Sequence, residues 1–308
     1  MSSPDISGGG FGRVYQTTTR SGALVAVKVL FENRWVAQRA LELSVREAWT
    51  WSTLSHPNIV PFLGVANYGL ICTGALPQLC LISPWMDGGN IREYVCEHPS
   101  VDRFRLLLDM AKGLQYLHTR FASPIIHGDI KGSNVLIDTR GRSVVARITD
   151  FGLAHLKEGL GEDGQATTST TSLGNLRWMA FERVLPANYG IHSNRASLSL
   201  ESDYFELMRT FYEVLTGKIP FHGMSEMAVF GALQLGQNPP RQVDGNTHID
   251  DGMWDLMQKA WCSDRDKRVH ILREVLEYLE GVVYFNALSG TLDLNEHTSK
   301  RLRDVGGL

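Results

Sequence analysis

Residues 125–138 read IIHGDIKGSNVLID, and this stretch of the 308-residue chain decides the fold class. It places Asp129, Lys131 and Asn134 within six positions, between apolar residues that suit a buried setting. An aspartate can accept the proton of a hydroxyl group, and a lysine two residues later can offset charge on a phosphoryl group in transfer. Polar loop residues also commonly satisfy nearby backbone groups. The stretch therefore indicates phosphoryl transfer only if the rest of the chain supplies nucleotide and metal ligands.

A second acidic motif lies downstream in ARITDFGLAH, residues 146–155. Asp150 follows an apolar, strand-like run and precedes Phe151 and Gly152, which suits a rigidly held carboxylate. Magnesium prefers oxygen donors, usually one or two carboxylates together with phosphates and water. Asp150 and Asn134 are chemically sufficient for such a site, and Asp129 is then free to act on a hydroxyl group.

The N-terminal part combines a glycine-rich turn, SGGGFGRVYQ (7–16), with an apolar strand, ALVAVKVLF (23–31). Glycines let the backbone approach phosphates and direct N–H groups at them, although a hairpin without a ligand has the same pattern. The two-residue period of a strand puts Ala26 and Lys28 on one face. A buried lysine needs an anion, and Glu47 on the next helix is a natural partner, unless Lys28 is simply solvated.

Apolar residues recur at helical spacing in two segments. In the first, 39–54, the repeat predicts one buried face made of Leu41, Val45, Ala48 and Trp51. In the second, 102–120, a buried amphipathic helix is predicted from Phe104, Leu107, Ala111, Leu114 and His118. Strand-like segments precede Gly88 and Gly89 and helical ones follow them. The order indicates an α+β chain in which a small strand-rich part precedes a larger helical part.

Composition excludes several classes of protein. The net charge is −3 and the isoelectric point is about 6.4, so no general basic field draws the chain to nucleic acid or anionic membranes. The four cysteines show no Cys-x-x-Cys spacing, which argues against a zinc site or a disulfide framework. No run of about 18 apolar residues is present, and the first residues lack signal-peptide character. We therefore expect an intracellular, cytoplasmic protein with no membrane and no nucleic-acid partner.

Together these motifs resemble the signature set of the protein kinases, and the likeness spans most of the chain. The resemblance implies a two-lobed α+β fold that binds ATP and Mg²⁺, with a hinge in LISPWMDGGNI (81–91). It implies catalytic roles for Lys28, Glu47, Asp129 and Lys131, and metal binding by Asn134 and Asp150. Ser83 takes the gatekeeper position, and Trp85 and Met86 lie beside adenine. The complete set of implied nucleotide contacts is Ser7, Gly8, Gly9, Gly10, Phe11, Gly12, Val14, Ala26, Lys28, Ser83, Trp85, Met86 and Leu136.

The same likeness divides the chain into parts. A kinase domain is expected over 1–285, with an N-lobe over about 1–84, a hinge over about 84–88 and a C-lobe over 89–285. Within the C-lobe, Arg268 is expected to pair with Glu182. Residues 286–308 are polar and are expected to follow the last helix as a C-terminal tail, or as a linker into a second kinase-like unit.

A finer resemblance is to the tyrosine-kinase-like group of serine/threonine kinases, through RWMA (177–180) and HPNIVPFLG (56–64). HGDIKGSN (127–134) is similar to the fungal expansion of that group. In the family, a lysine at the position of Lys131 accompanies serine and threonine substrates. The resemblance therefore implies transfer of the γ-phosphoryl group of ATP to serine or threonine hydroxyls of protein substrates.

Two alternatives remain open, because several residues depart from the family pattern: Ser7, Asn175, Phe181 and Val269. One is a catalytically weak or dead kinase-fold scaffold that binds nucleotide and protein partners, although the lysine and both aspartates of an active enzyme are present. The other is a small-molecule phosphotransferase, in which HGD followed by asparagine is also found. The segment WMAFE (178–182), typical of a peptide-substrate platform, argues against the second alternative.

Two features bear on regulation. Gly128 stands where many regulated kinases carry an arginine that binds a phosphorylated activation loop, which predicts activity independent of that contact. TTSTTS, residues 167–172, is either a phosphorylation segment that orders the loop or a flexible polar linker.

Overall fold

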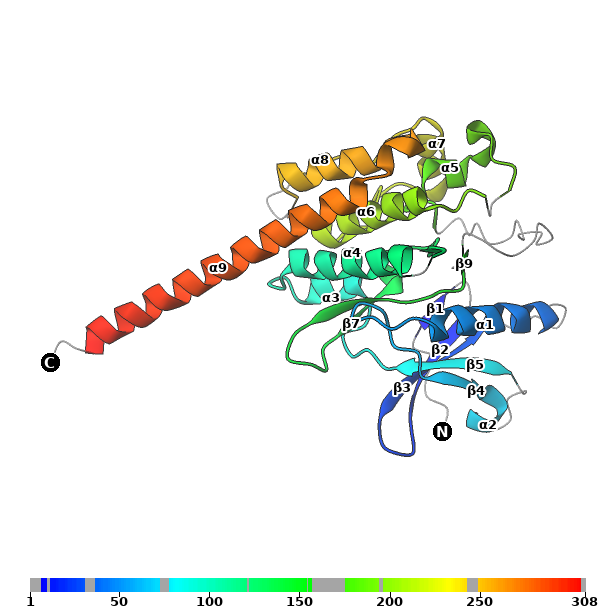
Figure 1. The fold of residues 1–308 in the computed structure, drawn as a ribbon, viewed down its shortest axis with the longest axis horizontal. Helices are drawn as coiled ribbons and strands as arrows, with labels where there is room; N and C mark the ends of the chain where they lie inside the picture. The colour runs from blue at the N-terminus through cyan, green and yellow to red at the C-terminus, as the bar shows by residue number, and fades with distance from the viewer. Residues whose placement is uncertain are drawn as a thin grey trace.

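The computed structural model describes residues 7–9, 12–30, 37–72, 78–120, 122–153, 155–156, 175–193, 196–242 and 249–305. A small N-terminal lobe holds a five-stranded sheet and one main helix, and a larger C-terminal lobe is mainly helical (Figure 1). The predicted two-lobed α+β fold is confirmed. Gly10, Phe11 and residues 167–172 lie outside the described ranges.

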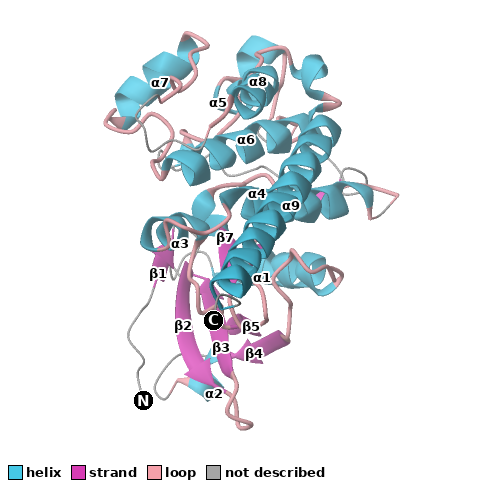
Figure 2. Ribbon diagram, turned by 90° about the vertical axis from the view of Figure 1, so that its left-hand side faces the viewer, coloured by secondary structure: helices cyan, strands magenta, loops and turns pink. Residues whose placement is uncertain are grey.

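The N-lobe sheet is antiparallel, with strand order β1-β2-β3-β5-β4 (Figure 2). Its strands are β1 (Ser7–Gly9), β2 (Gly12–Thr18), β3 (Leu24–Leu30), β4 (Gly64–Asn67) and β5 (Leu79–Pro84). The short helix α2 (Tyr68–Ile71) follows β4 directly. The β-branched residues of β3 suit a central strand, and Val25 and Val27 are buried there.

Helix α1 (Ala37–Ser52) packs against β4 and β5, but its buried face differs from the predicted one. Leu41 and Val45 are each 52% exposed, so the prediction that they line the core is wrong. Trp51 is buried as predicted and Ala48 is partly buried, and Ser44 and Glu47 are buried beside them. The reason is electrostatic, because Glu47 has to face the buried cation on β3, and that requirement sets the rotation of the helix.

The C-lobe is built around α4 (Arg103–Thr119) and α6 (Leu200–Thr216). The other helices are α3 (Ile91–Glu97), α5 (Phe181–Val184), α7 (Glu226–Gln234), α8 (Asp251–Ala260) and α9 (Ile271–Val305). As predicted, α4 buries Leu107, Ala111, Leu114 and His118, while Phe104 is partly buried. The side chain of Asp102 caps the first turn of α4 by accepting from the Arg105 N–H. None of the described helices has the length and apolar character that crossing a membrane requires.

Short strands next to the N-lobe flank and include residues 125–138. They are β6 (Ile125–Ile126), β7 (Val135–Asp138), β8 (Val145–Ile148) and β9 (His155–Leu156). β7 pairs with β8 and β6 pairs with β9, so residues 127–134 form a loop between two pairs of strands. A 3₁₀ turn (Gly132–Asn134) closes this catalytic loop, which we define as residues 127–134.

Two further expectations concern the C-lobe. Phe181, where proline was expected, is buried edge-on against Phe205, with 5.3 Å between ring centroids, so the departure fills the core. The polar segment predicted to follow the last helix is helical: α9 continues through it to Val305 and extends away from the C-lobe (Figure 1). A helix can continue through polar residues because its backbone hydrogen bonds lie within the helix, and the role of this segment as a tail or a linker stays a prediction.

Candidate active site

Lys28 joins the two lobes by ion pairs. β3 pairs with β2 and β5 in a register that sets Lys28 between Val14 and Leu81. The Lys28 Nζ lies 2.7 Å from Glu47 Oε1 and 2.9 Å from Asp150 Oδ1. The predicted pairing of Lys28 with Glu47 is therefore present, and the structure adds Asp150 as a second partner.

The charges of this cluster compensate one another. Burial alone would lower the pKa of Lys28, but Asp150 and Glu47 outweigh it and hold that pKa above its usual value. Burial also opposes ionisation of Asp150, yet the charge of Lys28 holds the pKa of this carboxyl below its usual range. For Glu47, burial is the stronger influence and raises the pKa. The cluster thus holds a charged lysine beside an ionised Asp150.

Asp129 is held by three donors. Its Oδ2 accepts from Lys131 Nζ at 2.8 Å and from Asn134 Nδ2 at 2.9 Å, and its Oδ1 accepts from Asn175 Nδ2 at 2.9 Å. The side chain is almost fully buried. A carboxylate has about four acceptor positions, so one remains for an incoming hydroxyl group.

Asn175 bridges the side chains of Lys131 and Asp129. Its Oδ1 accepts from Lys131 Nζ at 2.8 Å while its Nδ2 donates to Asp129. The sequence singled out Asn175 only as a departure from the family pattern and not as a member of the site. An amide offers a donor and an acceptor on one group, which is the property this bridge requires.

Asn134 and Asp150 fit a magnesium site by their donor chemistry. The Asn134 amide nitrogen is occupied by donation to the backbone and side chain of Asp129, which leaves its oxygen as the free ligand atom. The Thr149 N–H donates to the Asn134 carbonyl at 3.0 Å and so holds the residue before Asp150 against the catalytic loop. Asp150 itself has a positive φ of 69°. One carboxylate and one amide oxygen match what Mg²⁺ takes from a protein when phosphates supply the rest.

Asp203, in the first turn of α6, supports the catalytic loop from below. Its carboxylate accepts the backbone N–H groups of His127 and Gly128 at 2.8 Å each, and Nε2 of His118 also lies at 2.8 Å. Burial opposes ionisation of Asp203, but these hydrogen bonds and the nearby histidines hold its pKa below its usual range. Gly128 has φ +74°, and a Cβ there would lie 2.8 Å from Leu198 Cδ2. Only glycine fits this backbone without strain.

The sequence analysis missed two more carboxylates on the same face of α6. Glu206 Oε2 accepts the Ile130 N–H at 3.2 Å, and Glu213 Oε2 accepts the Gly132 N–H at 3.0 Å. Positions 203, 206, 210 and 213 repeat at helical spacing. That polar repeat inside an otherwise apolar helix was the available signal.

The expected nucleotide-binding residues occupy the strands around Lys28. Ala26 is directly paired with Ser83, which is buried, and Trp85 continues from β5 with its N–H bonded to Leu24 O. Met86 is only 4% exposed and packs in the main core. Leu136 on β7 is partly buried against the same core.

The glycine-rich turn is a β1-β2 hairpin. Ser7, Gly8 and Gly9 pair with Val14, Arg13 and Gly12. This register brings the paired strands beside Lys28, because Val14 is paired with Lys28 as well as with Ser7.

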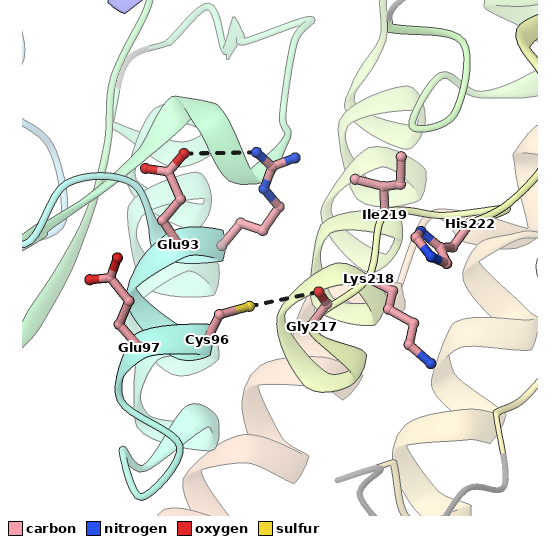
Figure 3. Close-up of a pocket in the computed structure, with 8 residues that line it drawn as sticks. Glu93, Cys96, Glu97, Gly217, Lys218, Ile219 and His222 are labelled. Atoms are coloured by element: carbon pink, nitrogen blue, oxygen red, sulfur yellow. Dashed lines mark hydrogen bonds and ion pairs between the residues drawn. The ribbon is translucent and has the colours of Figure 1, made fainter. Parts of the chain in front are cut away.

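A surface pocket of about 380 Å³ lies away from Lys28 and Asp150, between α3 and the connection from α6 to α7 (Figure 3). Cys96 on α3 points across it and donates to Gly217 O at 3.8 Å. All four cysteines of the chain are free thiols. The pocket adjoins the support of the catalytic loop, because Arg92 on its wall lies 4.0 Å from Glu213.

A two-lobed fold in which Lys28 pairs with Glu47 and Asp150 defines the class of protein as a kinase, and the loop in which Lys131 and Asn134 hold Asp129 agrees with it. The chain belongs to the family described as protein tyrosine and serine/threonine kinase, which it matches over residues 2–279. The likeness predicted from the sequence is therefore confirmed at the level of the family.

Named relatives refine the likeness. The chain is 29% identical over 282 residues to serine/threonine-protein kinase STY46 of Arabidopsis thaliana. The match covers 90% of this chain and 43% of that protein. It is 30% identical over 220 residues to serine/threonine-protein kinase TNNI3K of Homo sapiens, and the match covers 70% of this chain and 24% of that protein. Dual specificity protein kinase splA of Dictyostelium discoideum is 29% identical over 264 residues, and the match covers 79% of this chain and 10% of that protein. The chain thus spans less than half the length of these relatives. They agree with the predicted tyrosine-kinase-like group, while the fungal expansion stays a prediction.

Proposed function

We propose that this chain is an ATP-dependent protein kinase that phosphorylates serine and threonine hydroxyls. The observation that carries the proposal is the joint placement of Lys28, Asp150 and Asp129, each held by hydrogen bonds in the arrangement that phosphoryl transfer needs. Relatives named as serine/threonine kinases support the substrate class.

In the proposed mechanism, Lys28, held by Glu47, positions the phosphates of ATP. Asp150 and Asn134 would hold Mg²⁺, which would supply positive charge to the phosphates. Asp129 accepts the proton of the protein hydroxyl as the oxygen bonds to the γ-phosphorus and the bond to the ADP oxygen breaks. Lys131 offsets the charge that develops on the transferred group.

The direct test is a peptide-library assay with magnesium and ATP. Transfer to serine and threonine peptides is expected. Nucleotide binding without transfer to any peptide or protein would contradict the proposal and favour the scaffold alternative, while phosphorylation of small molecules alone would favour the other one.

Replacing Lys28 by methionine should lower kcat/KM for ATP by roughly 10- to 100-fold, because the phosphates lose one charge-assisted contact. Lys112→Met is the matched control, since Lys112 forms a surface pair with Glu280 at 3.1 Å, away from the site. The measurement is initial rate against ATP concentration. Equal kcat/KM values for the wild type and Lys28→Met would contradict the assigned role.

Replacing Asn175 by alanine removes the bridge between Lys131 and Asp129, and kcat should fall about tenfold for the loss of hydrogen bonds to charged groups. Asn175→Thr should retain most of the activity, because a hydroxyl also donates and accepts. Steady-state kinetics with one peptide substrate distinguishes the variants. If alanine and threonine behave alike, Asn175 does not act through its hydrogen bonds.

A further inference from the structure

Glu206 connects two parts of the active site that are distant in sequence. It lies on α6, is 1% exposed, and carries an ion pair from its Oε1 to Arg183 Nη1 of α5. Its other oxygen, Oε2, accepts the N–H of Ile130, the residue after Asp129. Thr210 Oγ1, one turn further along α6, lies 3.2 Å from the Ile130 carbonyl oxygen and 2.8 Å from the Glu206 carbonyl oxygen, so its one proton is shared between them. The backbone N–H and carbonyl of Ile130 thus both face polar side chains of α6.

The pair is a poor stabiliser in its own right. Removing two charges from water costs more than their attraction usually returns, and apolar replacements of similar size are often neutral or stabilising. The role of the pair therefore lies in the two segments that it connects. On one side is Arg183 of α5, eight residues after Asn175, and the Asn175 side chain holds Asp129. On the other side is the peptide that follows Asp129.

We propose that Glu206 is a positioning residue that couples α5 to the catalytic loop, through Arg183 on one carboxylate oxygen and Ile130 N–H on the other. The inference rests on the proposed kinase function and deepens it. Asp129 is then fixed twice by the same stretch of chain: Asn175 holds its side chain, and Arg183 acts through Glu206 on its backbone.

The coupling depends on ionisation. Burial raises the pKa of Glu206 to about 8, with Arg183 of α5 opposing the rise and the charges of Asp203 and of Asp129 in the catalytic loop adding to it. Between pH 7 and 9 the carboxyl loses its proton and gains full strength as an acceptor for both donors. We expect kcat to rise with pH across this range.

Stability responds in the opposite direction. A carboxyl with a raised pKa in the folded protein binds its proton more tightly there than in the unfolded chain. Its contribution to stability is complete below the ordinary carboxyl pKa and is lost as the pH rises through about 8. A purely structural role would make activity and stability fall together, whereas positioning predicts that kcat rises while stability falls.

Glu206→Gln is the informative variant. A carboxylate accepts on both oxygens, but an amide has one acceptor oxygen, so either Arg183 or the Ile130 N–H loses its acceptor. We expect kcat at pH 9 to fall about tenfold and its inflection near pH 8 to disappear, with KM for ATP unchanged within about twofold. Hydrogen exchange at the Ile130 amide should accelerate by about tenfold as well.

Asp109→Asn is the matched control. Asp109 is a buried carboxylate on α4 that accepts one backbone N–H, from Ala146 at 3.1 Å, and lies near one arginine, Arg105, at 3.8 Å. Burial raises its pKa as well. Because it supports β8 and not the catalytic loop, this variant should leave the kcat pH profile and Ile130 exchange unchanged.

The measurements are kcat and KM from pH 6.5 to 9.5, thermal unfolding, and amide exchange by mass spectrometry or NMR. If Glu206→Gln does not fold, Arg183→Gln removes the other partner: kcat should fall as well, and the inflection should move to higher pH because Arg183 opposes the rise in the pKa of Glu206. A folded variant with the wild-type kcat profile and wild-type Ile130 exchange would overturn the proposal. Exchange needs no turnover, so a wild type without kinase activity would overturn the proposed function while loss of Ile130 protection would still establish the coupling.

Discussion

Replacing Asp129 by asparagine is expected to lower kcat at least ~10²-fold, because an amide cannot accept the proton of the attacking hydroxyl. The amide also turns its own N–H groups toward some of the three donors that now hold the carboxylate, Lys131, Asn134 and Asn175. Since these contacts lie within one loop and its neighbour, nucleotide affinity should change much less than kcat. The measurement is single-turnover phosphorylation of a peptide together with ATP binding by calorimetry.

The control for this variant is Asp138→Asn. Asp138 is a buried carboxylate on β7, held by Arg140 and Arg147 at 2.8 and 2.9 Å, and it does not contact the catalytic loop in the described structure. Arg140 is the main reason that its pKa is held far below the usual range. The Asp138→Asn substitution should lower the free energy of unfolding and leave kcat of the folded protein unchanged. Wild-type turnover in Asp129→Asn would remove Asp129 from the mechanism.

The second large effect concerns stability. Arg268 Nη1 lies 2.7 Å from Glu182 Oε1, and both side chains are completely buried, as the sequence predicted for this pair. Glu182→Gln removes the countercharge of a buried guanidinium, which costs about 3–5 kcal/mol. Against a total stability of about 5–15 kcal/mol, such a loss should shift the urea midpoint strongly or prevent folding at 37 °C.

An exposed pair provides the comparison. Lys259 and Glu274 are 2.8 Å apart but lie largely in solvent, so Glu274→Gln should cost less than about 1 kcal/mol. Urea unfolding of the two variants measures the difference directly. Equal midpoints would mean that Arg268 is neutralised by something other than Glu182.

The elements that follow from local chemistry were predictable. Lys28, Asp129 and Asp150 were identified because each sits in a short motif whose residue types have few other uses together. The rotation of α1 was not predictable, because apolar spacing favoured Leu41 and Val45 and could not weigh the stronger demand that Glu47 meet Lys28.

The support of the catalytic loop was only partly predictable. The polar repeat on α6 marks Glu206 and Glu213, but it does not reveal that they bind backbone groups about 80 residues away in the chain. Asn175 was recognised only as a departure from the family pattern, because its role depends on hydrogen bonds to Lys131 and Asp129, which lie in another segment of the chain. Long-range hydrogen bonds decided these roles, and they exist only once the chain has folded.

Gly128 has a consequence for which side chains this position can accept. An arginine at this position would need a backbone with φ +74°, at a cost of about 1–2 kcal/mol, and its Cβ would lie 2.8 Å from Leu198. A side chain here is accepted only if the end of Leu198 moves aside and the backbone tolerates the strain. Gly128 and Leu198 therefore fit each other, and a phosphate-binding arginine at position 128 would have to displace Leu198 before it could reach a phosphorylated segment.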